Sequence, residues 1–301
     1  MSAAPERGVA PSTAADRLPA PERAWAYMVR CTDGSLYAGW TNDLARRLRA
    51  HKTGRGARYT RARGAVRLAY AERCESKSAA MRREAALKRL PKAEKERLAA
   101  DWQRQNRAVI RMAVPEDAAA VTALYNWYVT HSTATFQYTP AAEAEYRANI
   151  AAVLEKAPFL VAYSESGALL GYACAHPWHS REAYAWDVET TIYLAPDAAG
   201  CGLGRRLYTA LLELLALQGY RNAFALVAHP NPASEAFHRA MGFARCGLEP
   251  RTGYKFGRWL DLGCWVLALA RDEAVPAPVH FTPDARKMEQ ILQKANATQK
   301  M

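Results

Sequence analysis

The chain has 301 residues, half of them hydrophobic, and a formal net charge of +12. That length suggests about two domains at roughly 150 residues each, with enough apolar residues for packed cores. Because no apolar run approaches the ~20 residues of a membrane span and the N-terminus lacks an apolar signal segment, we expect neither a membrane nor a secreted protein. The six cysteines are scattered without a Cys-x-x-Cys pair, which argues against a zinc site or disulfide framework and favours the cytoplasm.

The positive charge is concentrated in the first third of the chain. Residues 1–107 contain 24 Lys and Arg against 11 Asp and Glu, whereas residues 108–301 contain 17 against 18. A basic module followed by a neutral one predicts a polyanion as the first partner and a small molecule as the second. A merely solvated charged surface is the alternative for the basic third.

The N-terminal part is predicted to contain a disordered tail and a small α/β domain. Residues 1–23 are rich in Ala, Pro, Arg and Ser without periodicity, which is typical of disorder. The domain is expected over 24–98, and a short polar linker over 99–108. Within this region we expect strands at 25–30, 35–39 and 66–72, helices at 44–51, 78–90 and 91–102, and a basic loop at 54–64.

Five side chains of the first domain occur at spacings that suit phosphodiester chemistry. Tyr27 and Tyr37 are ten residues apart on paired strands, Arg47 follows ten residues later, and His51 lies one helical turn beyond it, whereas Glu84 sits in a later helix among cations. Two tyrosines and an arginine can activate a water and stabilise a pentacoordinate phosphorus, and a carboxylate can hold a divalent metal ion. Alternatively, the tyrosines are cross-strand partners and the glutamate is an exposed helix charge.

With these residues in this order, the domain resembles the GIY-YIG nuclease superfamily, specifically its small single-domain branch. The sequence Ala-Tyr-Met-Val around Tyr27 stands for the first motif, and Tyr37-Ala38-Gly39 is the second. The resemblance implies a three-stranded antiparallel sheet with helices and DNA as partner. It implies Tyr37 as general base or nucleophile-positioning residue, Arg47 on the scissile phosphate, and Glu84 as ligand of a metal ion, usually Mg²⁺. A module that only binds nucleic acid remains an alternative.

Residues 109–270 are predicted to form a second α/β domain, followed by a tail at 271–301 with one or two helical turns at 288–292. Its order is strand–helix–helix–strand–strand–strand–helix–strand–helix–strand. The expected strands are 109–113, 159–163, 169–175, 189–194, 223–228 and 262–268, and the expected helices are 115–129, 141–154, 205–217 and 234–241.

Three glycines, Gly200, Gly202 and Gly204, lie between the fourth strand of this domain and its following helix. Glycines let backbone N–H groups approach a ligand, and a helix start offers unpaired donors that suit a phosphate. The third glycine of a dinucleotide fingerprint is missing, and no Gly-Lys-Ser/Thr follows as in a P-loop. A pyrophosphate cradle of another type or a plain tight connection therefore remains.

Four motifs in register make this domain similar to the GNAT acyltransferase fold, in particular to the phosphinothricin/methionine-sulfone acetyltransferase branch. They are residues 184–189, residues 200–204, residues 231–234 with His238, and residues 253–261. The resemblance implies a mixed sheet, acetyl-CoA as cofactor, a small amino-acid-like amine as acceptor, and a homodimer through this domain. The whole chain is thus predicted to be α+β.

The resemblance also assigns roles to individual residues. Glu189 would be the base that removes a proton from the acceptor ammonium, because an ammonium has no lone pair. His238 is interpreted as a buried structural histidine, with a second proton carrier as the alternative. Arg205 and Arg206 are interpreted as charges that compensate for Ala199, where many relatives carry Arg or Gln. Acetyl-CoA would bind to Ile192, Tyr193, Leu194, Gly200, Cys201, Gly202, Leu203, Gly204, Arg205, Asn231 and Ser234. The acceptor would bind to Phe136, Trp178, Tyr184, Trp186, Lys255 and Arg258.

Three interpretations of the whole chain follow. The leading one is a basic nuclease-like module fused to an N-acetyltransferase. The second is a DNA-processing nuclease whose GNAT domain acts as sensor or scaffold. In the third, the first module only tethers the acetyltransferase to nucleic acid.

Overall fold

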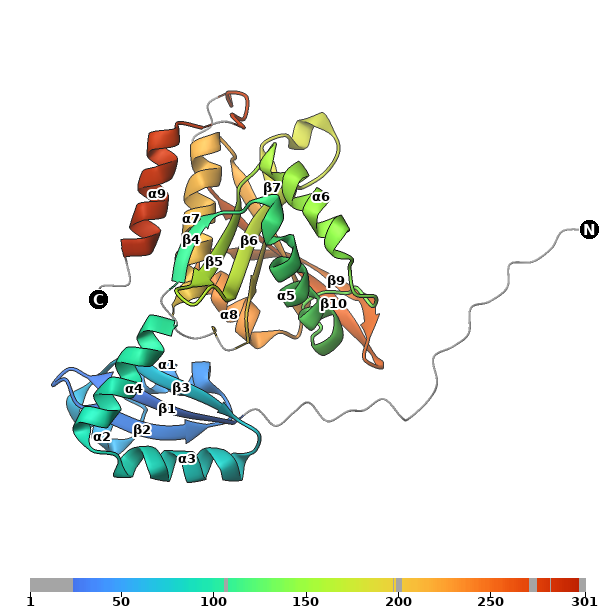
Figure 1. The fold of residues 1–301 in the computed structure, drawn as a ribbon. Coiled ribbons are helices and arrows are strands. Elements are labelled where there is room, and N and C mark those ends of the chain that lie inside the picture. The colour runs from blue at the N-terminus through green and yellow to red at the C-terminus, as the bar shows by residue number, and fades with distance from the viewer. Residues whose placement is uncertain are drawn as a thin grey trace, which may run out of the picture.

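The computed structural model of the chain describes residues 24–105, 108–196, 198, 202–270, 275–281 and 283–297. It contains a three-stranded antiparallel sheet with helices, followed by a seven-stranded mixed sheet with helices, which confirms the α+β prediction (Figure 1). The expected tail at 1–23 lies outside the described residues. In the part of the chain that is described, no helix is long and apolar enough to cross a membrane.

The first sheet has the order β2-β1-β3, with β1 at its centre. Alternate residues of β1 pack on opposite faces, since Ala26 and Met28 join one apolar cluster while Tyr27 and Val29 join another. A strand buried on both faces explains the continuous apolar run of its sequence. The elements are β1 (Ala24–Cys31), β2 (Leu36–Thr41), α1 (Leu44–Lys52), α2 (Arg58–Arg63), β3 (Ala65–Cys74), α3 (Lys77–Arg89) and α4 (Lys92–Gln105).

Two elements of this domain differ from the prediction. The expected basic loop at 54–64 contains the short helix α2, which lacks an apolar stripe and is anchored by the buried Thr60. Helix α4 continues to Gln105, through most of the expected linker. It does so because Leu98, Ala99 and Trp102, which share one helical face, pack on the core.

The second sheet has the order β4-β5-β6-β7-β8-β10-β9, in which β7 and β8 are parallel and the other neighbouring strands are antiparallel. Helix α7 lies along the sheet with most of its side chains buried. The strands are β4 (Ala108–Met112), β5 (Phe159–Ser164), β6 (Leu169–Pro177), β7 (Asp187–Leu194), β8 (Asn222–His229), β9 (Ala244–Lys255) and β10 (Arg258–Ala268). The helices are η1 (Pro115–Asp117), α5 (Ala118–His131), α6 (Glu143–Leu154), η2 (Glu182–Tyr184), α7 (Leu203–Gln218), α8 (Pro232–Ala240) and α9 (Ala285–Ala297).

The C-terminal segment is not a separate tail, because α9 packs beside α7 and β4 (Figure 1). Its apolar side chains Met288, Ile291, Leu292 and Ala295 belong to the core of the second domain. Asn296 fixes the helix end, since its Oδ1 accepts from Ile110 N at 2.8 Å and its Nδ2 donates to Ile110 O at 2.9 Å. The expected one or two turns are therefore a helix of 13 residues.

Strand β9 was not predicted. Its first nine residues are exposed, so their sequence lacks the alternation of apolar and polar residues that marks a half-buried strand. Pairing with β10 along the edge of the sheet makes it a strand.

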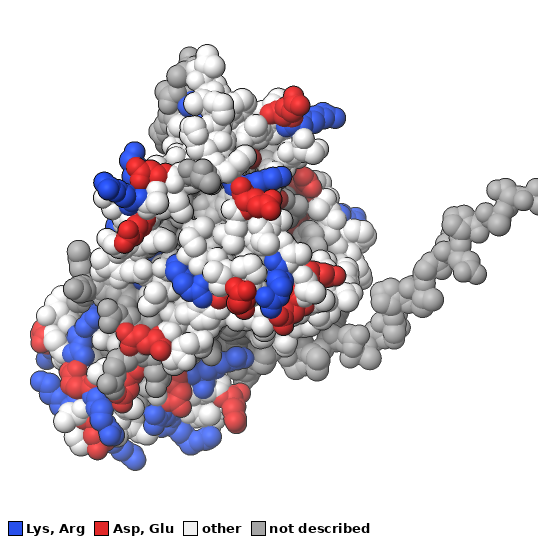
Figure 2. Space-filling model, turned by 45° about the horizontal axis from the view of Figure 1, so that its top comes forward, with Lys and Arg blue, Asp and Glu red and all other residues white. Residues whose placement is uncertain are grey.

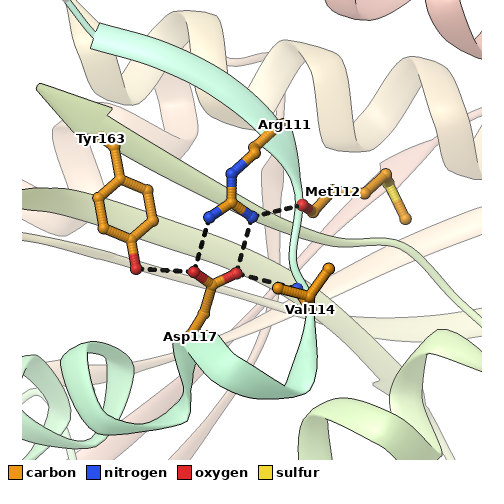
Figure 3. Close-up of polar contacts among 5 residues, drawn as sticks. All are labelled: Arg111, Met112, Val114, Asp117 and Tyr163. Carbon is orange, nitrogen blue, oxygen red and sulfur yellow. Dashed lines mark hydrogen bonds and ion pairs between the residues drawn. The ribbon is translucent and has the colours of Figure 1, made fainter. Parts of the chain in front are cut away.

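A buried carboxylate joins β4, η1 and β5 (Figure 3). The Nη1 and Nη2 atoms of Arg111 donate to Asp117 at 2.8 and 2.7 Å, and Val114 N and Tyr163 OH donate at 2.9 and 2.8 Å. Burial alone would raise the pKa of Asp117, but these donors hold that pKa below its usual value.

Candidate active sites

The two parallel strands at the centre of the second sheet separate at Glu189. Strand β7 pairs with β6 as far as Leu194 but with β8 only from Asp187 to Glu189. Ile192, Tyr193 and Leu194, three of the residues expected to bind acetyl-CoA, follow this separation on β7. Leu194 O accepts from Tyr128 OH at 2.7 Å, so this carbonyl already has a protein partner.

Glu189 is half-buried where this gap begins. Its register partners are His176 on β6 and Phe224 on β8, and the Phe224 ring stacks on Trp178 with centroids 4.2 Å apart. Burial raises the pKa of Glu189, which makes the carboxylate a stronger proton acceptor near neutral pH. His176 and Phe224 were not predicted, because only the strand register brings them beside the glutamate.

The start of α7 lies against the end of β7. Gly202 is the N-cap and has a φ of 89°, a left-handed conformation that favours glycine. A Cβ on Gly204 would lie 3.1 Å from Leu194 Cδ1, so the helix and the separated strand are in close contact. The first amides of α7 have no intrahelical acceptor and can bind an anion. Gly200 and Cys201, also predicted for this cradle, lie outside the described residues.

Arg205 and Arg206 do not share one role. Arg206 donates from Nε to Ala295 O at 2.8 Å and from Nη2 to Ala108 O at 3.1 Å. It therefore anchors α9 and β4, and the expectation that it adds charge to the cradle is wrong. Arg205 contacts Ala240 O on α8 at 3.3 Å.

Asn231 and Ser234 lie at the start of α8. Asn231 is the N-cap, and its Oδ1 accepts from Ser234 N at 3.2 Å. The Nδ1 of His238 is 2.9 Å from Ser234 O and 3.3 Å from Ser234 Oγ. His238 is buried against Phe243, and burial lowers its pKa, which agrees with a structural, neutral histidine.

The predicted acceptor residues fall into separate groups. Phe136 lies against Gly253, where an added Cβ would be 2.4 Å from the Phe136 ring. Lys255 joins this group: it is buried and donates from Nζ to Thr135 O at 2.7 Å, and burial lowers its pKa.

The other predicted acceptor residues have contacts of their own, and Arg258 is the register partner of Lys255 across β9 and β10. Trp178 and Tyr184 both contact the His179 ring, with centroids 4.8 and 4.7 Å away. Trp186 donates to Ala277 O at 2.8 Å and so holds the C-terminal segment, whereas Arg258 is exposed at the β9–β10 turn.

In the first domain the structure brings Tyr27, Arg47 and His51 together. Tyr27 OH is 2.7 Å from His51 Nε2 and accepts from Arg47 Nε at 3.0 Å. Burial raises the pKa of Tyr27 to about 12. Burial, and then the charge of Arg47, lowers the pKa of His51 to about 4. At neutral pH the phenol is therefore protonated and the imidazole neutral.

Tyr37 and Glu84 complete the predicted set. The half-buried Tyr37 ring lies 5.5 Å from the His51 ring and stacks on Tyr59 at 5.8 Å between centroids. Glu84 forms an ion pair with Lys88 at 2.7 Å and is close enough to raise the pKa of Tyr27.

A magnesium ion fits this arrangement, because Mg²⁺ is typically held by one or two carboxylates, substrate phosphates and waters. Within the described ranges no group of three or more His, Cys, Asp or Glu side chains is arranged to hold a metal ion. Glu84 would therefore share the ion with substrate oxygens and waters.

A basic hollow of about 500 Å³ lies beside this cluster, lined by Trp40, Thr41, Asn42, Arg46, Arg47 and Ala50. Figure 2 shows Lys and Arg side chains over the lower part of the molecule, where the first domain lies, with Asp and Glu among them. Such a hollow suits a phosphate group.

Comparison with known families agrees with this division of the chain. A model of the GIY-YIG catalytic domain matches residues 23–97, and a model of the acetyltransferase (GNAT) domain matches residues 110–263. A phosphinothricin N-acetyltransferase of Streptomyces viridochromogenes is 38% identical over 56% of this chain and 90% of its own length. An L-methionine sulfoximine/L-methionine sulfone acetyltransferase of Pseudomonas paraeruginosa is 37% identical over 56% of this chain and 99% of its own length.

Solved structures show the same similarity. A phosphinothricin acetyltransferase from Sinorhizobium meliloti in complex with acetyl-CoA has a TM-score of 0.55 and 36% identity, over 57% of this chain and 94% of its own. An acetyltransferase from Salmonella typhimurium with acetyl-CoA has a TM-score of 0.54 and 34% identity, over 56% and 98%. The chain therefore belongs to the GNAT family of acetyltransferases and carries a GIY-YIG domain ahead of its acetyltransferase domain.

Proposed function

We propose that the second domain transfers an acetyl group from acetyl-CoA to the primary amine of a small amino acid bearing a phosphinate, sulfone or sulfoximine group. The observation that carries this proposal is the half-buried Glu189 at the point where β7 leaves β8, beside the start of α7. The acceptor class is supported by the names of the relatives.

Acetyl-CoA supplies the acetyl group as a thioester. The amides of Gly202 to Arg205 would bind its diphosphate, and the free edge of β7 from Ile192 onward would bind the pantetheine amides. Glu189 would accept a proton from the acceptor ammonium, directly or through a water, so that the amine lone pair can attack the thioester carbonyl. Asn231 at the start of α8 would orient the thioester end.

The acceptor would be held by its carboxylate and by its phosphinate, sulfone or sulfoximine group. Lys255 is buried, donates from Nζ to Thr135 O and lies 5.2 Å from the centre of the Phe256 ring. An ammonium has three N–H donors, so Lys255 can also donate to a carboxylate. Phe136 beside it, and Trp178, which stacks on Phe224 next to Glu189, would with Tyr184 contact the apolar part of the acceptor.

The first test is an acceptor screen by thiol release from acetyl-CoA. Methionine sulfone, methionine sulfoximine and phosphinothricin are expected to be acetylated with kcat/KM at least about 10-fold higher than methionine. The reason is that hydrogen-bond donors that pair with the polar oxygens of these acceptors would stay unpaired beside the thioether of methionine. Equal rates for methionine and its sulfone would contradict the acceptor class. No release with any primary amine would contradict the transferase itself.

We propose that the first domain is a Mg²⁺-dependent DNA endonuclease. The convergence of Tyr27, Tyr37, Arg47, His51 and Glu84 supports this over a plain charged surface. Arg47 would bind the scissile phosphate, Tyr37 would position the attacking water, and Glu84 would hold the ion.

Replacing Tyr37 with Phe or Glu84 with Ala is expected to lower the rate of Mg²⁺-dependent cleavage of a DNA duplex by about 10²-fold or more. Cleavage is followed on gels with both variants and with Asp101→Asn as a control on α4. A wild-type chain that binds DNA with a steep salt dependence but does not cut it would favour the tethering alternative instead.

A further inference from the structure

Helix α2 places a buried hydroxyl next to His51, in the cluster formed by Tyr27, Arg47 and His51 (the Tyr27 cluster). Thr60 is 1% exposed, and its Oγ1 is 2.7 Å from His51 Nδ1 and 3.0 Å from Ala57 O. Neither α2 nor Thr60 was predicted to take part in this site. Both contacts involve the same hydroxyl, which has a single proton to donate.

These distances determine the direction of every hydrogen bond in the cluster. A carbonyl can only accept, so the Thr60 proton points to Ala57 O and His51 Nδ1–H donates to Thr60. In the neutral imidazole the other nitrogen, Nε2, then has a lone pair and accepts from Tyr27 OH. The Tyr27 oxygen in turn accepts from Arg47 Nε. This is the assignment in which all four contacts are hydrogen bonds.

We infer that Thr60 is a positioning residue for the first domain: through the chain Arg47→Tyr27→His51→Thr60→Ala57, it fixes the His51 tautomer and orients the Arg47 guanidinium. The Nε of Arg47 is thereby occupied, and the guanidinium also interacts with Tyr37. Its remaining N–H groups can donate to a phosphate in the basic hollow that Arg47 lines.

These hydrogen bonds give Tyr27 and Tyr37 different roles. Tyr27 has no exposed surface and stays protonated, because burial raises its pKa to about 12. It therefore holds Arg47 in place and does not act as the base. Tyr37 is half-buried beside His51 and is the tyrosine left for the attacking water. The catalytic role of these hydrogen bonds rests on the proposed nuclease function, but the tautomer of His51 does not.

The test is to determine the His51 tautomer by ¹⁵N NMR in the full chain with labelled histidine, using His51→Gln to assign its signals among the seven histidines. Wild type and Thr60→Ser are expected to carry the proton on Nδ1. Thr60→Val, which has a similar shape but no hydroxyl, is expected to lose this tautomer. Protonation of His51 at Nε2 in the wild type would overturn the inference, whether or not the chain cleaves DNA.

A second readout follows the effect on Arg47. Thr60→Val is expected to lower the cleavage rate by about 10²-fold, since misplacement of a phosphate-binding group by about 1 Å has effects of that size, and Thr60→Ser is expected to restore it. If the wild type proves unable to cleave, the Kd for a DNA duplex at low salt takes the place of the rate. A Thr60→Val chain that keeps the tautomer, rate and affinity of the wild type would overturn the positioning role.

Discussion

Replacing Glu189 with Gln is expected to lower the rate of acetyl transfer by about 10²–10⁴-fold, with a smaller effect on the KM for acetyl-CoA. General base catalysis contributes an effect of that size, and glutamine cannot accept the proton of the acceptor ammonium. The carboxylate of Glu189 lies where β7 and β8 separate. Glutamine keeps nearly the same side-chain shape, so the substitution removes the proton acceptor without changing the packing. Thiol release under saturating acceptor measures the loss.

The pH profile gives an independent check of the same residue. Burial raises the pKa of Glu189, and only its ionised form accepts a proton. The wild-type rate is therefore expected to rise with pH through this raised pKa, and Glu189→Gln is expected to lose that limb.

The same pKa shift has a consequence for stability. A carboxyl whose pKa is higher in the folded than in the unfolded state destabilises the fold above the unfolded pKa, fully so above the folded pKa. Glu189→Gln removes this penalty and is expected to be at least as stable as the wild type at pH 7, so a loss of activity cannot be ascribed to unfolding.

Glu213→Gln is the matched control, because Glu213 forms an exposed ion pair with Lys294 on the outer face of α7. Its rate is expected to stay within twofold of the wild type. An unchanged rate in Glu189→Gln, with the wild-type pH profile retained, would remove the base from the mechanism.

Replacing Asp117 with Ala is expected to lower the free energy of unfolding by about 1–3 kcal/mol. The loss arises because Arg111, Val114 N and Tyr163 OH lose their common acceptor (Figure 3). The Arg111 side chain is 43% exposed, so water solvates the charge that remains and limits the loss. Urea unfolding followed by tryptophan fluorescence measures the change.

The pH dependence of this site has the opposite sign to that of Glu189. The pKa of Asp117 is lowered in the folded state, so its stabilising contribution is present above the unfolded pKa and is lost as the pH falls through the folded pKa. The difference in the free energy of unfolding between the wild type and Asp117→Ala is therefore expected to become smaller at acidic pH.

Glu143→Ala provides the comparison, since its ion pair with Arg147 is exposed and lies within one turn of α6. Such a pair contributes about 0.3–0.5 kcal/mol. If Asp117→Ala lowered the free energy of unfolding no more than Glu143→Ala does, the hydrogen bonds to Asp117 would not stabilise the second domain.

Most of the regular elements were predictable, because each has a local signal. The apolar alternation or runs of β1, β5 and β6, the N-cap Asp43 before α1 and the helical stripe of α7 all lie within short windows of sequence. The elements that were missed lack such a signal. Helix α2 depends on a contact between Thr60 and His51, and the exposed strand β9 depends on pairing with β10.

Side chains of the candidate sites were predictable only in part. Motif spacing and the two family resemblances gave Glu189, Tyr27, Tyr37, Arg47 and Glu84 as candidates, because family motifs carry those residue types at those spacings. They did not reveal that Trp186 holds residue Ala277 or that Arg206 holds α9.

The amino-acid sequence alone determined the division into a basic and a neutral domain, both families and the candidate catalytic side chains, since these depend on composition and on spacing along the chain. The tertiary structure alone decided the neighbours of each side chain: His176 and Phe224 beside Glu189, and Thr60 behind His51. Those contacts join residues from different strands and helices, and their hydrogen-bond directions and pKa shifts arise from burial that exists only after the chain has folded.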